Sequence, residues 1–173
     1  VHALSDWDEG LYANIASELA RTGEWWQLKL QGAPWFDKEP LGFGLMAISL
    51  KLFGLKIWAL RLPALLATMA TAPILWWLLR TRLSRGVSVV ISILFWTAPV
   101  LWCRHMLGTA DLEALTLLFS VAIPAAVARW PHRVWPAATL WGLFLLTRGV
   151  WALPFLGLLI VGESVHWWQT RDW

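Results

Sequence analysis

The sequence predicts an all-α protein, a polytopic membrane helix bundle with two amphipathic surface helices in its first extracytoplasmic loop. Of its 173 residues, 58% are hydrophobic and only 14% are charged, whereas a soluble domain has about 45–50% apolar and about 25% charged residues. Apolar runs of membrane-spanning length fill the chain after residue 56, and many of its 16 Trp stand near the ends of those runs, as in interfacial aromatic belts.

Two surface helices are expected within residues 1–56, which are too polar to span a membrane. The first runs from residue 8 to 21, where Leu11, Ile15 and Leu19 recur every four residues and Gly23 follows as a stop signal. The second runs from residue 41 to 53, where the apolar positions are Leu45, Ile48, Leu52 and Phe53. Both patterns are typical of helices lying on a bilayer, joined here by a loop over residues 32–40.

Five spans are expected after this loop, because a spanning helix needs about 17–25 mostly apolar residues. They cover residues 57–79, 86–103, 112–128, 134–146 and 149–168. The last two are separated by Thr147-Arg148-Gly149, which we interpret as a turn, since an Arg within one long span would be costly. The chain is thus expected to form a single module over residues 1–173, and its start at Val1 without a signal peptide suggests a piece of a longer protein.

Charge is distributed unequally between the two faces of the expected bundle. If the spans alternate, the two loops on one face hold five arginines and no acid: Arg80, Arg82, Arg85, Arg129 and Arg133. The positive-inside rule makes that face cytoplasmic. The acids Asp6, Asp8, Glu9, Asp37, Glu39, Asp111 and Glu113 all fall on the opposite face.

Several classes of protein are excluded by the same composition. The arginines are scattered at the ends of apolar runs and form no stripe for nucleic acid. The single Cys103 permits no internal disulfide, and the four His are dispersed. There is no Gly-rich phosphate loop, so no nucleotide cofactor is expected.

The pair Asp8-Glu9 is the first candidate for chemistry, because it places two carboxylates directly over the membrane domain. The alternative is structural. Acids in the first turn of a helix are favoured by the helix dipole, with Ser5 as the N-cap.

Asp37-Lys38 is the second candidate, because it joins a hard oxygen ligand to a phosphate-binding ammonium. The alternative is an exposed ion pair of little energetic value.

Three further candidates lie at the ends of spans on the acid-bearing face. Arg104 either binds an anion or reaches the membrane interface, and Asp111 either serves the site or caps a helix, with Thr109 as a rival cap. Arg148 needs a lipid headgroup or a neighbouring carboxylate as its partner. Together these residues predict a pocket at the membrane surface for a lipid-borne phosphate.

A family resemblance supports this hypothesis. The stretches D-E-G-L-Y-A-N-I-A-S-E-L-A-R-T-G-E-W and G-A-P-W-F-D-K-E-P-L-G-F-G-L, followed by L-F-G and A-L-R-L-P-A-L-L, resemble the first extracytoplasmic loop of bacterial GT-C glycosyltransferases. The similarity is to aminoarabinose transferases that modify lipid A and to protein O-mannosyltransferases. The later T-A-D-L-E-A-L-T-L and L-L-T-R-G-V-W-A-L-P match in the same order. The match covers most of the chain, as the N-terminal part of such an enzyme without its first transmembrane helix.

The resemblance implies transfer of a sugar, with inversion, from a polyprenyl-phosphate carrier to a lipid A-like lipid, a protein or a glycan. It implies a place in the bacterial inner membrane, with the active site on the periplasmic face. Asp8 would be the main catalytic carboxylate, with Glu9 beside it and Asp111 as the second acid. Lys38, Arg104 and Arg148 would meet the carrier phosphate, and Asp37 would help to hold a divalent metal cation.

Two other classes of function compete with this hypothesis. A transporter of lipids or solutes would carry polar residues deep within its spans, and the spans expected here are nearly free of them. A non-catalytic membrane partner with the same fold would tolerate loss of Asp8 or Lys38, and both are present.

Overall fold

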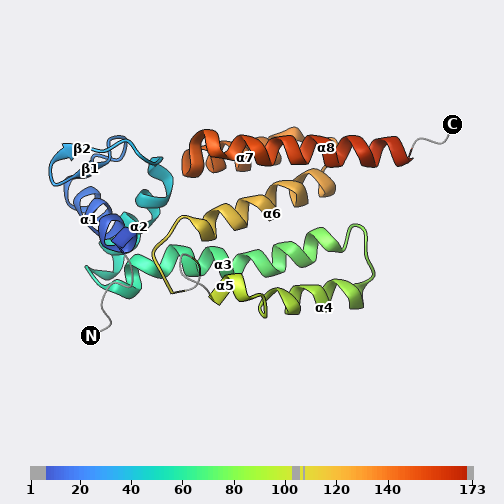
Figure 1. The fold of residues 1–173 in the computed structure, drawn as a ribbon, viewed down its shortest axis with the longest axis horizontal. Coiled ribbons are helices and arrows are strands. Elements are labelled where there is room, and N and C mark those ends of the chain that lie inside the picture. Colours follow the sequence, from blue (N-terminus) through green and yellow to red (C-terminus); the bar gives the residue numbers. More distant parts are fainter. Residues whose placement is uncertain (1–6, 103–105, 107, 171–173) are drawn as a thin grey trace.

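The structure, a computed structural model, describes residues 7–102, 106 and 108–170, and its described part is almost entirely helical (Figure 1). We call residues 7–53 the head and the helices from residue 57 onward the bundle. The head contains α1 (Trp7–Thr22), β1 (Lys29–Leu30), β2 (Ala33–Pro34) and α2 (Pro40–Phe53). The bundle contains α3 (Ile57–Leu79), α4 (Arg85–Phe95), α5 (Pro99–Trp102), α6 (Glu113–Arg129), α7 (Val134–Arg148), the 3-10 helix η1 (Gly149–Ala152) and α8 (Leu153–Thr170).

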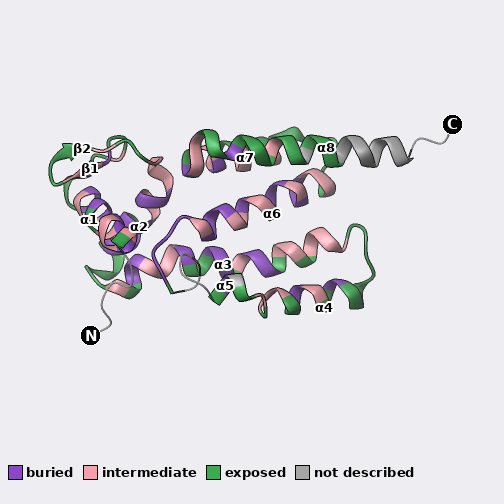
Figure 2. Ribbon diagram, viewed as in Figure 1, coloured by how far each residue is buried: buried purple, intermediate pink, exposed green. Residues whose placement is uncertain are grey.

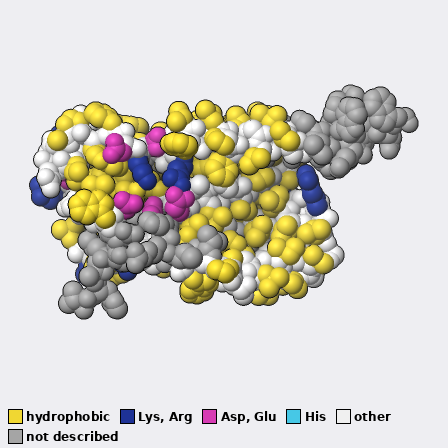
Figure 3. Space-filling view, viewed as in Figure 1, with side chains coloured by type: hydrophobic (Ala, Val, Ile, Leu, Met, Phe, Trp, Pro, Cys, Tyr) yellow, Lys and Arg dark blue, Asp and Glu magenta, His cyan; other side chains and the backbone are white. Residues whose placement is uncertain are grey.

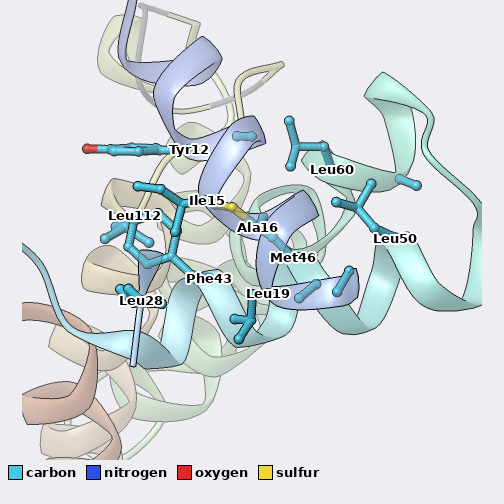
Figure 4. Close-up of a cluster of buried hydrophobic side chains, with 14 residues drawn as sticks. Tyr12, Ile15, Ala16, Leu19, Leu28, Phe43, Met46, Leu50, Leu60 and Leu112 are labelled. Atoms are coloured by element: carbon cyan, nitrogen blue, oxygen red, sulfur yellow. The ribbon is translucent and has the colours of Figure 1, made fainter. Parts of the chain in front are cut away.

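The two expected surface helices are confirmed, and their mutual packing builds the core of the head. Ile15 and Leu19 of α1 lie fully or almost fully buried against Phe43 and Met46 of α2 (Figure 4). The helix α1 ends as expected at Gly23, which has a φ of 73° and whose N–H donates to the Leu19 carbonyl. Positive φ is easily adopted only by glycine, so the residue closes the helix and turns the chain.

A short hairpin between the two head helices was not predicted. Leu30 of β1 pairs with Ala33 of β2 in an antiparallel register, and the turn residues Gln31 and Gly32 have φ values of 54° and 81°. Two successive residues with positive φ are typical of a type I′ turn. The Glu18 carboxylate of α1 accepts a hydrogen bond from the Gly32 N–H at 3.0 Å, which fastens the hairpin to α1.

The bundle helices run back and forth, with the head at one end (Figure 1). The helices α3 and α6 both run away from the head and pack along each other, while α4 returns beside α3 and α7 returns beside α6. The Arg80–Arg85 and Arg129–Arg133 loops therefore lie together at the end far from the head, as the sequence predicted.

The helices α7 and α8 form two antiparallel elements, which confirms the turn expected at Thr147-Arg148-Gly149. By length and composition, two stretches of the described residues could cross a membrane, 57–79 and the apolar run 134–162. The second stretch folds back on itself, because the rings of Phe144 in α7 and Phe155 in α8 stand only 5.4 Å apart. The reversal occurs at Gly149, whose φ is 53°.

The expected span over residues 86–103 is shorter and is broken in the structure. The helix α4 ends at Phe95, and α5 begins at Pro99, whose ring removes the N–H that would continue a helix. The last residue expected in this span, Cys103, lies outside the described residues.

The surfaces of the bundle indicate that lipid is its solvent. The outward faces of α4, α7 and α8 are exposed in Figure 2, and those faces are apolar. In α4, Val90 and Ile93 are exposed, whereas Ser88 and Ser92 are buried and donate to carbonyls one turn earlier, at 2.9 and 2.8 Å. A helix that turns apolar side chains outward and small polar ones inward is typical of a helix in a bilayer.

Most of the apolar face predicted for α2 is turned outward, although its first residue, Leu45, packs against a buried cluster of the bundle. Ile48 and Phe53 are exposed and Leu52 is 71% exposed, whereas the core is built from the opposite side of the helix through Phe43, Met46 and other buried residues. The helix is therefore apolar on two sides. One packs on α1 and the other is available to the membrane, which agrees with the predicted surface position.

Close packing of α2 against Leu112, the residue before α6, supplies a test of the fold. A Cβ added at Gly42 in α2 would stand 2.0 Å from Leu112 Cδ2, whereas one at Gly44 would meet only Trp25, at 3.9 Å. We expect Gly42→Ala to lower the free energy of unfolding by about 1–3 kcal/mol through overpacking. Thermal unfolding in detergent measures the change.

The matched control is Gly44→Ala in the same helix. It should be neutral or stabilise by up to about 1 kcal/mol, because alanine is the better helix former. Equal effects of the two substitutions would contradict the described packing of α2 on Leu112.

Candidate functional site

A buried ion pair connects the head to the bundle. Arg61 in α3 donates from Nε to Glu9 Oε1 at 2.6 Å and from Nη2 to Glu9 Oε2 at 2.8 Å. The Ala110 N–H donates to Glu9 Oε1 at 3.0 Å. Because Glu9 is only 2% exposed, its carboxylate joins α1, α3 and the segment before α6 in one network, which we call the Glu9 clasp.

The clasp explains why an Arg, Arg61, lies near the start of the expected span over residues 57–79. A cation within an apolar helix at membrane depth needs a partner, and a planar guanidinium can meet both carboxylate oxygens at once. The signal for its role was therefore present in the sequence, but its partner stands 52 residues away in the chain.

Three groups of the predicted site, Asp8, Lys38 and Asp111, converge on Tyr12, which lies one turn after Asp8 in α1. Lys38 Nζ stands 5.2 Å from the centre of the Tyr12 ring. Burial raises the pKa of the Tyr12 hydroxyl above its ordinary value, a hydrogen bond and the charge of Lys38 lower this pKa, and the charges of Asp111 and Asp8 raise it. The structure therefore brings Asp8, Lys38 and Asp111 together around a tyrosine that sequence analysis did not select.

Arg148 has the carboxylate partner that was one of its predicted alternatives. Its Nη2 donates to Glu113 Oε1, and its Nε donates to Thr116 Oγ1 at 2.7 Å. The next residue, Gly149, approaches the head so closely that an added Cβ would stand 1.7 Å from Glu39 Oε1. The turn between α7 and η1 therefore lies against the loop that carries Lys38 and Glu39.

These contacts connect into a ring at the junction of head and bundle. From Glu9 the ring passes through Ala110 to Asp111 and Glu113, then through Arg148 and Gly149 to the Lys38-Glu39 segment, and returns to α1 at Tyr12. Figure 3 shows acidic and basic side chains gathered at this junction, surrounded by apolar surface. The predicted convergence of charges from separate segments is thus present.

The contacts of Asp8, Glu9 and Asp111 bear on whether these acids only stabilise the ends of helices. Asp8 and Glu9 lie in the first turn of α1, as a helix N-terminus favours, but the Glu9 carboxylate is used by Arg61. Asp111 Oδ1 accepts from the adjacent Leu112 N–H at 2.6 Å, and α6 has no side-chain cap. Thr109 as a rival cap is wrong, because its buried Oγ1 has no hydrogen-bond partner within the described part of the chain.

For the remaining predicted residues, the structure shows few or no contacts that bear on a function. Asp37 is exposed, and no ion pair to it occurs among the described residues, so the alternative of an Asp37–Lys38 pair is not what the structure shows. Arg104 and Ser5 lie outside the described residues. No three carboxylate, His or Cys side chains in the described part of the chain come close enough to hold a metal ion.

An apolar groove opens beside the ring of charges. It has a volume of about 460 Å³ and lies between α2, α3 and α6. Leu62 and Pro63, which directly follow Arg61, line it together with Leu115 and the exposed face of α2. A charged site and an apolar groove thus meet within one helical turn, a combination that suits an amphiphilic ligand.

Solved structures identify the fold. The structure matches the crystal structure of ArnT from Cupriavidus metallidurans in the apo state, with a TM-score of 0.79 and 22% identity over 98% of this chain. The match establishes a GT-C membrane fold for the described helices and confirms the predicted fold class.

Curated relatives agree with that match, although no family model matches the chain. The chain is 34% identical over 183 aligned positions to an undecaprenyl phosphate-alpha-4-amino-4-deoxy-L-arabinose arabinosyl transferase 1 of Pseudomonas fluorescens, covering 98% of this chain. It is 29% identical over 120 residues, 69% of the chain, to the transferase of the same name from Edwardsiella ictaluri. The chain spans only 32% and 21% of these two relatives, and 33% of the ArnT chain.

We expect the Glu9–Arg61 ion pair to contribute far more to the free energy of unfolding than the more exposed Lys29–Glu24 pair of the head. Arg61→Gln should lower the free energy of unfolding by about 3 kcal/mol, because it leaves the buried Glu9 carboxylate without its cation. Thermal or denaturant unfolding in detergent measures the loss.

The matched control is Lys29→Gln, which removes the more exposed Lys29–Glu24 pair and should cost less than about 1 kcal/mol. A loss for Arg61→Gln no greater than that of the control would show that the Glu9 clasp does not hold the head.

Proposed function

We propose that the chain is part of an integral membrane glycosyltransferase that moves a sugar from a polyprenyl-phosphate carrier to an acceptor outside the cytoplasm. The observation that carries the proposal is the ring of acids and bases, set beside an apolar groove at one end of a membrane bundle. The named activity of the curated relatives supports this choice of donor. The acceptor is a lipid A-like lipid, a protein or another glycan.

The chemical step requires an acid–base group and a cation. In an inverting transfer, the acceptor oxygen forms a bond to the anomeric carbon while the bond from that carbon to the phosphate oxygen breaks. The electron pair of the broken bond leaves with the polyprenyl phosphate. A hydroxyl acceptor passes its proton to the Asp8 carboxylate, which acts as general base. A phosphate acceptor is already ionised, and Asp8 then only orients it.

The cations of the ring have separate parts in this proposal. Lys38, half-buried beside Tyr12, is placed to meet the phosphate of the carrier, where a fixed positive charge stabilises the departing anion. Arg148 is already held by Glu113 and Thr116, so its part includes keeping the α7 turn against the head. Arg104 remains a proposed phosphate contact, by resemblance alone.

The two other acids differ in their freedom to act. Both oxygens of Glu9 bind Arg61, and Oε1 also accepts from Ala110. We therefore assign Glu9 a positioning role, since it fixes the neighbouring Asp8 and the start of α6. Asp111 is buried, yet its charge reaches Tyr12 together with that of Asp8, which favours a role next to the reacting groups.

The apolar groove supports a lipid-linked donor. Its lining begins with Leu62, the residue after Arg61, and with Leu115, near the start of α6. A prenyl chain in this groove would bring its phosphate to the ring of charges. Burying methylene groups in such a groove is favourable by about 0.8 kcal/mol each when they leave water. A prenyl chain that enters from the bilayer leaves an apolar solvent instead, so its binding depends mainly on how closely it fits the groove.

Transport is the weaker alternative on structural grounds. Within α3 and α4, the buried polar side chains are Ser and Thr, and those with described bonds donate to carbonyls of their own helix one turn earlier. Among the described residues, charged side chains gather at the helix ends instead of along a path through the bundle. Transporters place polar groups near the middle of the membrane.

The proposed location is the bacterial inner membrane, with the ring of charges on the periplasmic side. It rests on the five arginines at the opposite end of the bundle and on the positive-inside rule. A divalent metal at Asp37 has no support from the described residues, because no second and third ligand accompany this exposed carboxylate. No step of the proposed mechanism passes through a metal.

Transfer of label from polyprenyl-phosphate sugars tests the function. In membranes carrying the native-length protein that contains this chain, Asp8→Asn should reduce transfer to a hydroxyl acceptor at least about 100-fold, the usual worth of a general base. Label is followed separately into lipid and protein fractions, so the experiment also identifies the acceptor class.

The control is Glu18→Gln in the same helix, whose amide oxygen can still accept from the Gly32 N–H. It should transfer at the wild-type rate. Undiminished transfer by Asp8→Asn at normal abundance would reduce Asp8 to a helix-end acid, and no transfer by the wild type with any donor would remove the enzyme hypothesis.

A further inference from the structure

Tyr12 is a buried residue of the ring to which neither the sequence analysis nor the proposed mechanism assigns a role. It is the only tyrosine of the chain and is 2% exposed. Its ring packs edge-on against Phe43 of α2, with the ring centres 5.2 Å apart. Figure 4 shows its hydroxyl pointing away from the apolar cluster that holds the ring. A tyrosine placed in this way has a fixed ring and a polar end directed outward.

The Tyr12 ring also supports the Lys38 ammonium. Lysine is a flexible side chain that loses much conformational entropy when it is held. Nζ of Lys38 lies 5.2 Å from the ring centre, within the range of a cation–π contact. The contact leaves the ammonium free to donate hydrogen bonds, so the lysine can be held in place and still bind an anion.

We infer that Tyr12 is the residue that positions Lys38 for the phosphate of an amphiphilic substrate, through its ring and its hydroxyl together. This inference rests on the proposed function for the nature of the substrate. It assigns to Tyr12 a positioning role, and it assigns the affinity for phosphate to a preorganised pair of residues, one from α1 and one from the loop before α2.

The surroundings of Tyr12 explain why the pair is suited to an anion. Asp8 lies one helical turn before Tyr12, and both Asp8 and Asp111 act electrostatically on its hydroxyl, in opposition to Lys38. The burial of Tyr12 keeps its hydroxyl protonated at neutral pH, so it can donate a hydrogen bond to a phosphate oxygen or accept one from the ammonium. Without Lys38, the two neighbouring acids would repel a phosphate.

Binding of undecaprenyl phosphate in detergent micelles, measured without any sugar transfer, tests the inference on the native-length protein. Tyr12→Phe keeps the ring and should weaken binding only about 3-fold, the worth of one hydrogen bond. Tyr12→Leu removes the ring and should weaken binding about 10- to 30-fold. Leu19→Ala, in the same helix and the same apolar cluster, controls for loss of core packing and should bind as the wild type does.

A second readout reports on the pair directly. Tyrosinate absorbance, taken as the difference between the wild type and Tyr12→Phe, follows ionisation of Tyr12 alone. Because Lys38 lowers the pKa of Tyr12, Lys38→Gln should raise it. Bound undecaprenyl phosphate should also raise it, since the anion adds negative charge beside the hydroxyl.

The outcomes separate this inference from the proposed function. Binding that depends on the Tyr12 ring, in a protein that transfers no sugar, would keep the inference and remove the glycosyltransferase. Binding by Tyr12→Leu that equals the wild type, or that falls only as far as in Leu19→Ala, would overturn the inference. So would a Tyr12 pKa that does not respond to Lys38→Gln, or a wild type that does not bind the lipid phosphate.

Discussion

The ion pair between Glu9 and Arg61 is the interaction on which the rest of the structure depends. Each partner would be costly alone, since Glu9 is almost fully buried and Arg61 lies in the first turns of an apolar helix. Together, and with the Ala110 N–H, they satisfy each other. The head can therefore dock on the bundle in one orientation, and that orientation brings α1 next to the segment that precedes α6. The Ser49 hydroxyl, which donates to the Ala59 carbonyl at 2.5 Å, fixes α2 to α3 close by.

The helices of this protein could be predicted from sequence because lipid and core impose simple patterns. Apolar residues at four-residue spacing, followed by a glycine, predicted the bounds of α1 to within one residue. The lengths of the apolar runs predicted α3, α6, α7 and α8. The prediction failed where a local contact decided the outcome. Pro99 breaks the second span, and Gln31 and Gly32 close a hairpin through positive φ. The outward-facing apolar stripe of α2 was predicted, but its second apolar side, which packs on α1 through Phe43 and Met46, was not.

The site was predicted residue by residue, but its pairings were not. Asp8, Lys38, Asp111 and Arg148 do meet at the junction of head and bundle. The partners Arg61 for Glu9 and Glu113 for Arg148 are 52 and 35 residues distant in sequence, and no local pattern specifies contacts of that range. Tyr12 was missed because an aromatic residue on the buried side of a helix is usually only part of the core, and its contact with Lys38 requires the docking of two segments.

The central claim is that the Glu9–Arg61 pair acts as a unit in docking the head. A double-mutant cycle tests it directly, with Glu9→Gln and Arg61→Gln made singly and together and the free energy of unfolding measured in the same detergent. Each single change leaves one charge buried without its partner, whereas the double change removes both. We therefore predict that the double variant is more stable than the sum of the single losses implies, with a coupling of about 2 kcal/mol or more. Additive losses, with a coupling near zero, would contradict the account.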